Sequence, residues 1–515
     1  MKRLISILLC VLLLAGLLGG CGTEEKPYTP TGAGLTWDED YTGPAKEKPE
    51  ESNQSLTLTY YPQRSMNPYL CTDYTNRALF SLLYQSLFTV DRSYKVEPQL
   101  CKSYKVSQDM KTYTFYIDKA TFSDGTALTV ADVVASLLSA KESAYYSGRF
   151  THIADITPGA DGGIVITTKT AMENLPLLLD IPIIKQTELQ ADTPLGTGPY
   201  YLDASTQNPL LRRNSKWWCK KELVVTAPAI TLQVATSEQD IRDAFEFEGL
   251  SLVCANPGSD RYADYRCDYE LWDCESGVFL YLACNMDSEV FSLPAVRSAL
   301  TFAIDRDALA DAYYRGFARS TSLPMSSQCP YYSNNLASKY AYDGGEKFTQ
   351  AVTSASKNRA EIVLLVNKDD SLRLRVAKDI AAMLSESGLK VTLSEKSTSA
   401  FRTALKKKEY DLYLGQTKLS PNMDLSVFFS SKGALNYGGI SDVALYTLCT
   451  EALANHGNYF TLNKSVMDDG RLCPILFSSY AVYATRGLLT GLTPARDSVF
   501  YYSMERSMEN ALIKE

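Results

Sequence analysis

Three short apolar segments, EIVLLV at 361–366, KVTLS at 390–394 and YDLYLG at 410–415, alternate with more polar runs that begin near residues 371 and 400. The apolar segments have the length of buried strands, and they contain β-branched residues in the first two cases and tyrosine in the third. The runs between them repeat apolar residues every three or four positions, which is typical of amphipathic helices. Strands that alternate with helices predict an α/β fold, in which helices cover a sheet.

The first half of the chain adds further elements of both kinds. Leu56–Tyr60 alternates apolar and polar residues and predicts a strand, and Thr112–Ile117 predicts another. Asn76–Leu87 places most of its apolar residues on one face of a predicted helix. Thr129 and Asp132 have the spacing of a capping box, so we expect a second helix to begin there.

The N-terminus has the features of a secretory signal peptide. A basic dipeptide precedes the apolar run 4–18, and the quartet LGGC follows at 18–21. The run is shorter than the ~20 residues that a helix needs to cross a bilayer. The quartet resembles the bacterial lipobox, in which the cysteine, here Cys21, is lipidated and becomes the new N-terminus. We therefore expect a lipoprotein signal peptide at 1–21; a plain signal peptide without lipidation is the alternative.

Residues 22–54 are rich in proline and acidic residues and show almost no apolar periodicity. Such a segment buries too little surface to offset the chain entropy that it would lose on ordering. We predict a flexible tether with a reach of roughly 30 Å, followed by a folded body that begins near Leu56. Lipid on Cys21 would hold this body outside the cytoplasm, on the outer face of the cell membrane.

The composition is that of an ordinary globular protein. The 515 residues are 45% hydrophobic and 21% charged, and the mature part is long enough for about three domains. Without the basic dipeptide of the signal peptide, the net charge is about −10. An acidic chain without a basic stripe argues against a nucleic-acid partner. We expect a monomer.

Cysteine is frequent for an exported protein, with twelve residues. Cys10 leaves with the signal peptide and Cys21 takes the lipid, so ten remain. Four of these fall between residues 254 and 284, at spacings that match no zinc module. Disulfides are permitted outside the cytoplasm, and free buried cysteines that act as small hydrophobic residues are an equal alternative. We expect no metal site and no cofactor.

The residues of common hydrolase sites are scarce. His152 and His456 are the only histidines. Two histidines are few for a histidine-based catalytic triad or a multi-histidine metal site. The sequence contains no G-x-S-x-G, H-E-x-x-H or P-loop motif. Ser354–Lys357 matches the S-x-x-K motif of penicillin-binding enzymes without its companion motifs. Among 59 acidic residues, a catalytic pair of carboxylates stays an open alternative. We expect that the protein is not an enzyme, and we assign no catalytic residue.

Several short motifs follow one another along most of the body. They are KTYTF at 111–115, FSDG at 122–125, LTVADV at 128–133, GTGPY at 196–200, LRRN at 211–214 with Trp217, AVRSAL at 295–300, AIDR at 303–306, YDL at 410–412 and CPILF at 473–477. Each motif alone has a local structural explanation, as where glycine and proline turn the chain at 196–200. In this order they resemble the family 5 extracellular solute-binding proteins, the peptide-binding class of ABC importer receptors.

The resemblance implies a two-lobed α/β protein of the periplasmic-binding-protein type, cluster C, with its ligand cleft between the lobes. Lobe I would be discontinuous and comprise 55–78, 194–279 and 485–515. A small domain II, 79–193, would be inserted in it. Lobe II, or domain III, would cover 280–484.

The resemblance also implies a function. A substrate-binding lipoprotein of this kind captures di- or oligopeptides outside the membrane and delivers them to an ABC permease and its ATPase. Two alternatives stay open: an extracellular ligand sensor for a membrane receptor, and a receptor for a non-peptide solute.

Tyrosine is the commonest aromatic residue, with 34 copies, and its ring offers a cleft both apolar contact and a hydroxyl. In relatives, the cleft is bordered by the loop after the first strand and by the loop after the strand at 410–415. The candidate ligand contacts in and beside these loops are Asn67, Tyr69, Asp73, Tyr74, Asn76, Gln416, Lys418, Asn422 and Asp424.

One of these loops bears on the nature of the ligand. Many peptide-binding relatives hold the ligand's α-ammonium with an aspartate after this strand, because a desolvated ammonium needs a charge partner. Here Leu419 stands about where that acid is expected, beside Lys418. Either Asp424 takes the ammonium, or the ligand lacks a free amine and presents an acidic group to Lys418.

Overall fold

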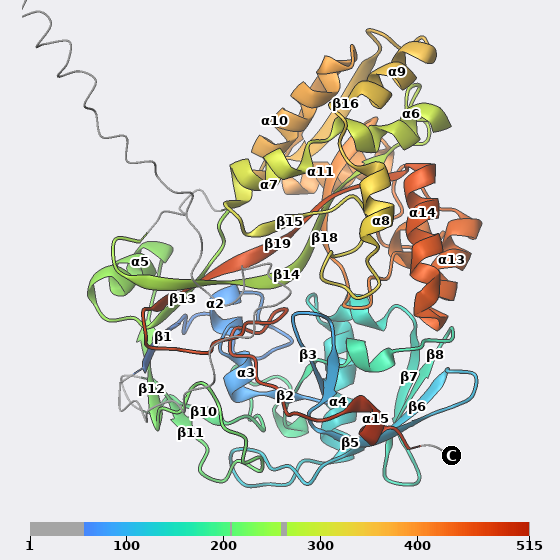
Figure 1. Ribbon diagram of the computed structural model, residues 1–515. Helices are drawn as coiled ribbons and strands as arrows, with labels where there is room; N and C mark the ends of the chain where they lie inside the picture. The colour runs from blue at the N-terminus through green and yellow to red at the C-terminus, as the bar shows by residue number, and fades with distance from the viewer. Residues whose placement is uncertain (1–55, 206–208, 259–264, 514–515) are drawn as a thin grey trace, which may run out of the picture.

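A computed structural model describes residues 56–205, 209–258 and 265–513 (Figure 1). The predicted signal peptide, Cys21 and the predicted tether lie outside these residues. Within the described ranges, no helix combines the length and the apolar character that a bilayer span requires.

A mixed sheet runs through the middle of the molecule. Among the described residues it has eleven strands, in the order β10-β11-β12-β1-β13-β19-β14-β18-β16-β17, with β15 paired to β19. In chain order these strands are β1 (Leu56–Tyr60), β10 (Tyr200–Asp203), β11 (Leu210–Arg213), β12 (Ala229–Val234), β13 (Leu252–Ala255), β14 (Tyr269–Cys284), β15 (Ala318–Ser320), β16 (Glu361–Asn367), β17 (Lys390–Lys396), β18 (Leu412–Lys418) and β19 (Leu472–Thr485).

The two longest strands, β14 and β19, form the central strand pair. They are antiparallel over almost their whole length, and each also pairs with a strand on its other side, β18 with β14 and β13 with β19. Figure 1 shows the pair crossing the molecule diagonally, with β1, β12 and β13 at one end and β16 and β18 at the other. The central strand pair therefore connects the two halves of the sheet.

The half of the sheet beyond β18 confirms the predicted alternation of strands and helices. Helices α10 and α11 lie between β16, β17 and β18 in the chain, and β16 pairs in parallel with both strands. Val376, Ile380 and Leu384 of α10 are buried, as the periodicity predicts. Gly388 has φ +91° directly after the helix, a conformation that suits glycine at a helix end. The helices of this half are α6 (Pro294–Ala299), α7 (Arg306–Tyr314), α8 (Asn334–Ala337), α9 (Glu346–Ser354), α10 (Ser371–Glu386), α11 (Thr398–Lys407), α12 (Ser426–Phe429), α13 (Val443–Ala454) and α14 (Tyr459–Asp469).

A smaller four-stranded sheet, in the order β5-β6-β8-β7, lies apart from the large one (Figure 1). Helix α4 begins at the predicted capping box, in which Thr129 accepts from the N–H of Asp132 and the Asp132 carboxylate accepts from the N–H of Thr129. Buried Val133 and Leu137 are on this helix. The strands are β2 (Gln85–Ser86), β3 (Phe88–Val90), β4 (Val96–Pro98), β5 (Cys101–Val106), β6 (Thr112–Ile117), β7 (Ile153–Pro158), β8 (Ile164–Thr168) and β9 (Pro182–Ile183). The remaining helices are α2 (Tyr74–Arg77), α3 (Phe80–Leu83), α4 (Val130–Glu142), α5 (Glu238–Phe247) and α15 (Met508–Ala511), and 3₁₀ turns span Ser147–Phe150, Leu175–Leu178, Gln186–Glu188, Leu300–Ala303, Ser338–Tyr340 and His456–Asn458.

The single helix predicted at Asn76–Leu87 is wrong. Two one-turn helices, α2 and α3, and strand β2 replace it. The carbonyl of Leu83 accepts a hydrogen bond from Gly198 at 3.0 Å instead of continuing a helix. Side chains at Gly196 and Gly198 would collide with this backbone, so glycine is needed there for the close approach. A contact with a distant segment thus overrides the local helical pattern.

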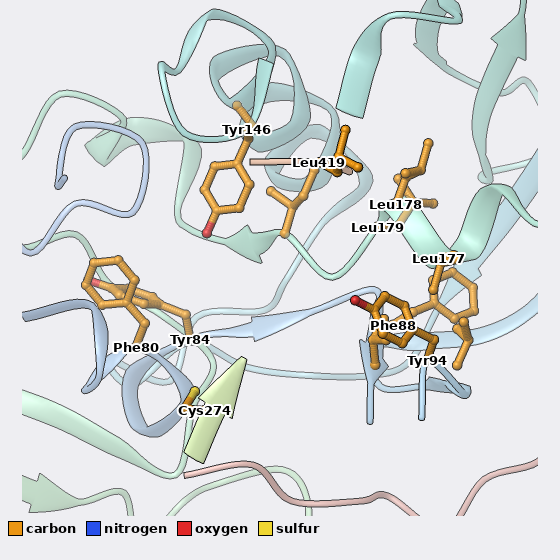
Figure 2. Packing of buried hydrophobic residues seen from close by; sticks show 14 of the residues in the cluster. Phe80, Tyr84, Phe88, Tyr94, Tyr146, Leu177, Leu178, Leu179, Cys274 and Leu419 are labelled. Carbon is orange, nitrogen blue, oxygen red and sulfur yellow. The ribbon is translucent and has the colours of Figure 1, made fainter. Parts of the chain in front are cut away.

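The main hydrophobic core extends from the small sheet to the central strand pair. Figure 2 shows part of it: Phe80 and Tyr84 are drawn on the same side as Cys274 of β14, and Phe88 is drawn apart from them, beside Tyr94 and Leu177. All ten cysteines in the described ranges are free thiols, and eight of them are buried. The alternative of free, core-forming cysteines is therefore the one that the structure adopts.

Candidate functional site

The central strand pair is interrupted by a bulge at Ser276 and Gly277, where the register between β14 and β19 shifts. Gly277 has φ +67°, and a side chain at this position would collide with the guanidinium of Arg496. The carbonyl of Gly277 accepts from the N–H of Leu419 at 3.0 Å, and that of Ser276 accepts from Lys418 Nζ. Bulges of this kind often aim side chains at functional sites. Here the bulge contacts two segments that are distant in the chain, residues 418–419 and the segment that contains Arg496.

Buried and half-buried charged residues gather around this bulge, with the tyrosines that contact them. We call them the charged cluster; its members are Arg77, Tyr94, Tyr145, Arg149, Asp180, Glu275, Lys418, Arg496 and Asp497.

Asp497 is at the centre of the cluster. Its Oδ1 accepts from Lys418 Nζ at 2.6 Å and from the hydroxyl of Tyr145 at 2.8 Å. Burial favours the protonated form, but the positive charges of Lys418, Arg496 and Arg77 outweigh this effect and lower the pKa of Asp497 to about 2. Asp497 is therefore ionised at neutral pH.

Lys418 is the cation most easily discharged. Burial lowers its pKa to about 7, and the neighbouring Arg496 and Arg77 charges act in the same direction, against the attraction of Asp497. Its Nζ also lies 4.7 Å from the centre of the Tyr145 ring. The positive charge of Lys418 is thus present only in part at neutral pH.

Two further arginines, Arg77 and Arg149, belong to the charged cluster. The guanidinium of Arg77 stacks on the Tyr145 ring, 3.2 Å from its centre, and donates to the hydroxyl of Tyr146 at 2.8 Å. Arg149 forms an ion pair with Asp180. Burial and the charge of Arg496 lower the pKa of Arg149 to about 10.

Arg496 is the least satisfied member of the charged cluster. The residue is buried, with only 3% of its surface exposed. Nη2 donates to the carbonyl of Leu419, whereas Nε and Nη1 have no hydrogen-bond partner among the described residues. Glu275 Oε2 and Asp497 Oδ2 also lack a partner there. Burial raises the pKa of Glu275, to which Tyr94 donates.

Two of the cavities among the described residues bear on this site. The cluster cavity, of about 80 Å³, is lined by Arg77, Arg149 and Arg496 among others. The cleft cavity, of about 400 Å³, is lined from one half of the molecule by Tyr74 and from the other by Gln416. Its remaining lining residues are Glu238, Asn256, Gly258, Val278, Leu280, Tyr314, Asp369, Asp370, Ser371, Leu372, Leu476 and Ser478.

Three of the predicted contacts thus lie in the charged cluster or line the cleft cavity. Lys418 belongs to the charged cluster, while Tyr74 and Gln416 line the cleft cavity, where Tyr74 also stacks on Tyr480 at 5.1 Å. Their role as ligand contacts stays a prediction.

The other candidates in the first loop support the main chain. The amide of Asn67 donates to two carbonyls and accepts from the N–H of Tyr69. Asn76 makes three hydrogen bonds to backbone groups of residues 61 and 64. The hydroxyl of Tyr69 donates to the carbonyl of Pro182, and Asp73 caps α2. These hydrogen bonds hold the loop in shape, and the structure does not place the four side chains in either cavity.

Asn422 and Asp424 lie away from the charged cluster. Asp424 Oδ2 is 3.1 Å from His152 Nε2, which is also 2.9 Å from Ser426 Oγ, and all three side chains are buried. The side chain of Asn422 accepts from Ser420 at 2.7 Å. Burial acts against ionisation of Asp424, but hydrogen bonding to His152 and Ser426 outweighs it and lowers the pKa. The carboxylate expected to take a ligand ammonium is already paired.

Arg77, Tyr145, Glu275, Arg496 and Asp497 were not predicted. Part of the signal is present in the sequence, because Arg496 and Asp497 form an isolated charged pair in an otherwise apolar stretch, and Glu275 interrupts a strand of buried residues. Charged residues rarely become fully buried without a paired or functional role. Which of these residues come together depends on the fold, and their spacing in the sequence does not indicate it.

Comparison with known proteins identifies the relatives of this chain. The model of the bacterial extracellular solute-binding proteins, family 5 (middle region), matches residues 95–437. The glutathione-binding protein GsiB of Escherichia coli strain K12 is 27% identical over 278 residues, which are 49% of this chain and 52% of GsiB. GsiB of Shigella flexneri gives the same figures. The chain thus spans about half the length of the curated relatives that it matches.

Solved structures share the fold over most of the chain. NikA from Brucella suis in complex with Fe(III)-EDTA has a TM-score of 0.67 at 20% identity, covering 84% of this chain and 95% of NikA. The substrate-binding protein CtaP from Listeria monocytogenes reaches 0.71 at 18%, covering 87% and 97%. A putative peptide-binding protein AppA from Clostridium difficile also reaches 0.71, at 15%, covering 87% and 98%. At such identities the likeness concerns the fold, and it confirms the predicted two-lobed α/β architecture. Because the family model matches well over half of its residues, this chain belongs to the bacterial extracellular solute-binding proteins of family 5.

Proposed function

We propose that the protein is the substrate-binding component of an ABC importer. It captures a small solute in the cleft between its lobes and delivers it to a membrane permease driven by a separate ATPase. One observation carries the proposal: a buried, incompletely satisfied charged cluster lies where the central strand pair connects the two halves of the sheet. Such a position lets one ligand contact both lobes at once.

The proposed solutes are di- or oligopeptides. The names of GsiB and of the Clostridium difficile AppA give glutathione and peptides as what those proteins bind, and many tyrosines near the cavities suit peptides of varied side chains. The proposal includes no chemistry on the ligand. We also propose that the protein functions as a monomer, that it lies outside the cytoplasm, and that a lipid on Cys21 anchors it.

The proposed domain boundaries follow the connections of the chain. Lobe I comprises 55–78, 194–279 and 485–515, domain II is 79–193, and lobe II is 280–484. The boundaries near 279 and 485 fall in or next to β14 and β19, so the central strand pair would act as the hinge between lobes.

A thermal-shift screen of the mature protein against di- and tripeptides tests this function. A ligand at a hundredfold excess over Kd should stabilise the folded state by about 2.7 kcal/mol. Deleting the gene should abolish uptake of the same compound. Stabilisation by a peptide whose uptake survives the deletion would support sensing in place of transport; stabilisation by no peptide would contradict the peptide assignment.

A further inference from the structure

The charged cluster contains more positive than negative groups. Its cations are Arg77, Arg149, Lys418 and Arg496, and its carboxylates are Asp180, Glu275 and Asp497. A neighbouring group adds Arg92 and Arg319, which both pair with Asp273. Moving charges out of water costs several kcal/mol for each ion unless a partner of opposite sign is present. An anion is the component that would balance this cluster.

Hydrogen-bond donors show where the anion would bind. Arg496 Nε and Nη1 are buried and have no partner among the described residues. Nε and Nη1 offer N–H groups on opposite sides of the guanidinium, so a carboxylate would accept from one of them, in a charge-assisted hydrogen bond that is stronger than one between neutral groups. The cluster cavity beside Arg496 has about 80 Å³, enough for a group of a few atoms.

The acids of the cluster are poorly placed to hold an ammonium. Asp497 already faces Lys418, and Asp180 is paired with Arg149. Asp424 is paired with His152 outside the cluster, and Leu419 is apolar. The remaining acceptors, Glu275 Oε2 and Asp497 Oδ2, suit a neutral N–H or O–H donor next to the anionic group.

We propose that the charged cluster is a subsite for a carboxylate on the ligand, held by Arg496 with Arg77 and Lys418 nearby, and that a free amine is not required. This rests on the proposed function and narrows its substrate class. A peptide would enter the cluster with its carboxyl end, and its last amide N–H would face the free acceptor oxygens.

The lowered pKa of Lys418 gives the subsite a second property. A bound carboxylate favours the charged form of the lysine and raises its pKa above about 7. Binding above neutral pH should therefore take up a proton, and affinity should fall as pH rises.

A chemically blocked peptide pool tests the inference while the ligand is still unidentified. A tryptic digest of casein is divided into three portions: untreated, N-acetylated, and methyl-esterified at its carboxyl groups. Thermal shift of the wild-type mature protein is measured with each portion, and with succinate and citrate as non-peptide carboxylates. We expect the untreated and acetylated pools to stabilise the protein and the esterified pool to have no effect.

Variants then assign the subsite. Arg496→Gln should weaken the effective carboxylate probe by about 10- to 100-fold, the range for hydrogen bonds to a charged group. Arg212→Gln is the matched control, since it makes the same substitution on the distant strand β11, where Arg212 pairs with Asp203 outside the charged cluster. Circular dichroism checks that each variant is folded. The pool comparison needs no variant, so the test stands even if Arg496→Gln does not fold.

The outcomes separate this inference from the proposed function. Equal stabilisation by the esterified and untreated pools would overturn carboxylate recognition and leave peptide binding intact. Stabilisation by succinate or citrate alone, lost in Arg496→Gln, would support the subsite and overturn the peptide assignment. If no carboxylate probe of either kind stabilised the wild type, the inference would be wrong.

Discussion

The bulge glycine shows how one residue sets the geometry of the site. Gly277 needs its positive φ, and its missing side chain leaves room for Arg496. We expect Gly277→Ala to destabilise the protein by about 1–3 kcal/mol and to displace the guanidinium. Gly125→Ala is the control, because Gly125 also has positive φ, at +88°, but nothing within 4 Å of an added Cβ. Urea unfolding should show the larger loss at Gly277; equal losses would mean that the contact with Arg496 contributes nothing.

Lys418 gives the unliganded protein a defined pH dependence. Its pKa of about 7 lies below the ordinary 10.5, so between these values the unfolded chain holds a proton that the folded chain releases. The free energy of unfolding should therefore rise with pH in this window, by at most about 1.4 kcal/mol per unit. Lys418→Met keeps the length of the side chain and should remove this part of the slope. Identical slopes for the two proteins in urea unfolding from pH 7 to 10 would exclude the effect.

Between elements, two histidine–carboxylate pairs join the small-sheet region to the helices of the other half. His152 and Asp424 are both buried, whereas His456 pairs at 3.4 Å with Glu173, which is 46% exposed. Removing one partner of a buried pair leaves the other charge uncompensated. We expect His152→Ala to lower the free energy of unfolding by about 3 kcal/mol and His456→Ala to lower it less. Chemical denaturation compares them; a greater cost at His456 would contradict this assignment.

Elements whose signal is local could be predicted from the sequence. The strands and helices between residues 361 and 418 follow apolar periodicity within each segment, and the capping box at Thr129 spans only four residues. The helix predicted at 76–87 failed because Leu83 bonds to Gly198, far along the chain. The charged cluster was missed for the same reason, since Arg77, Lys418 and Arg496 meet only in the folded molecule. Lys418 was predicted because it follows the strand expected at 410–415; the structure extends this strand, β18, to Lys418, so the residue does not lie in a loop.

At the scale of the whole molecule, we predict that the proposed lipid anchor and ligand binding are separable. Strand β1 is the first element among the described residues, and the predicted lipobox cysteine precedes it in the sequence. Cys21→Ala should release the protein from the membrane into the soluble fraction and leave ligand affinity unchanged. Fractionation without detergent, followed by calorimetry on the released protein, checks both parts. A Cys21→Ala variant that stays as firmly bound as the parent would rule out lipid as the anchor.

The excess of positive charge also bears on movement of the lobes. Under the proposed boundaries Lys418 is in lobe II and Arg77 and Arg496 are in lobe I. Without an anion, the like charges of these three residues in a poorly solvated site repel one another. A bound carboxylate would replace this repulsion by attraction across the hinge, so ligand binding and closure become one event.

Small-angle X-ray scattering of the mature protein, with and without the carboxylate ligand found by thermal shift, tests this coupling most directly. We predict a smaller radius of gyration with the ligand than without it, and no change for the methyl ester of the same compound. A ligand that raises the melting temperature but leaves the radius of gyration unchanged would contradict closure of the lobes around the charged cluster.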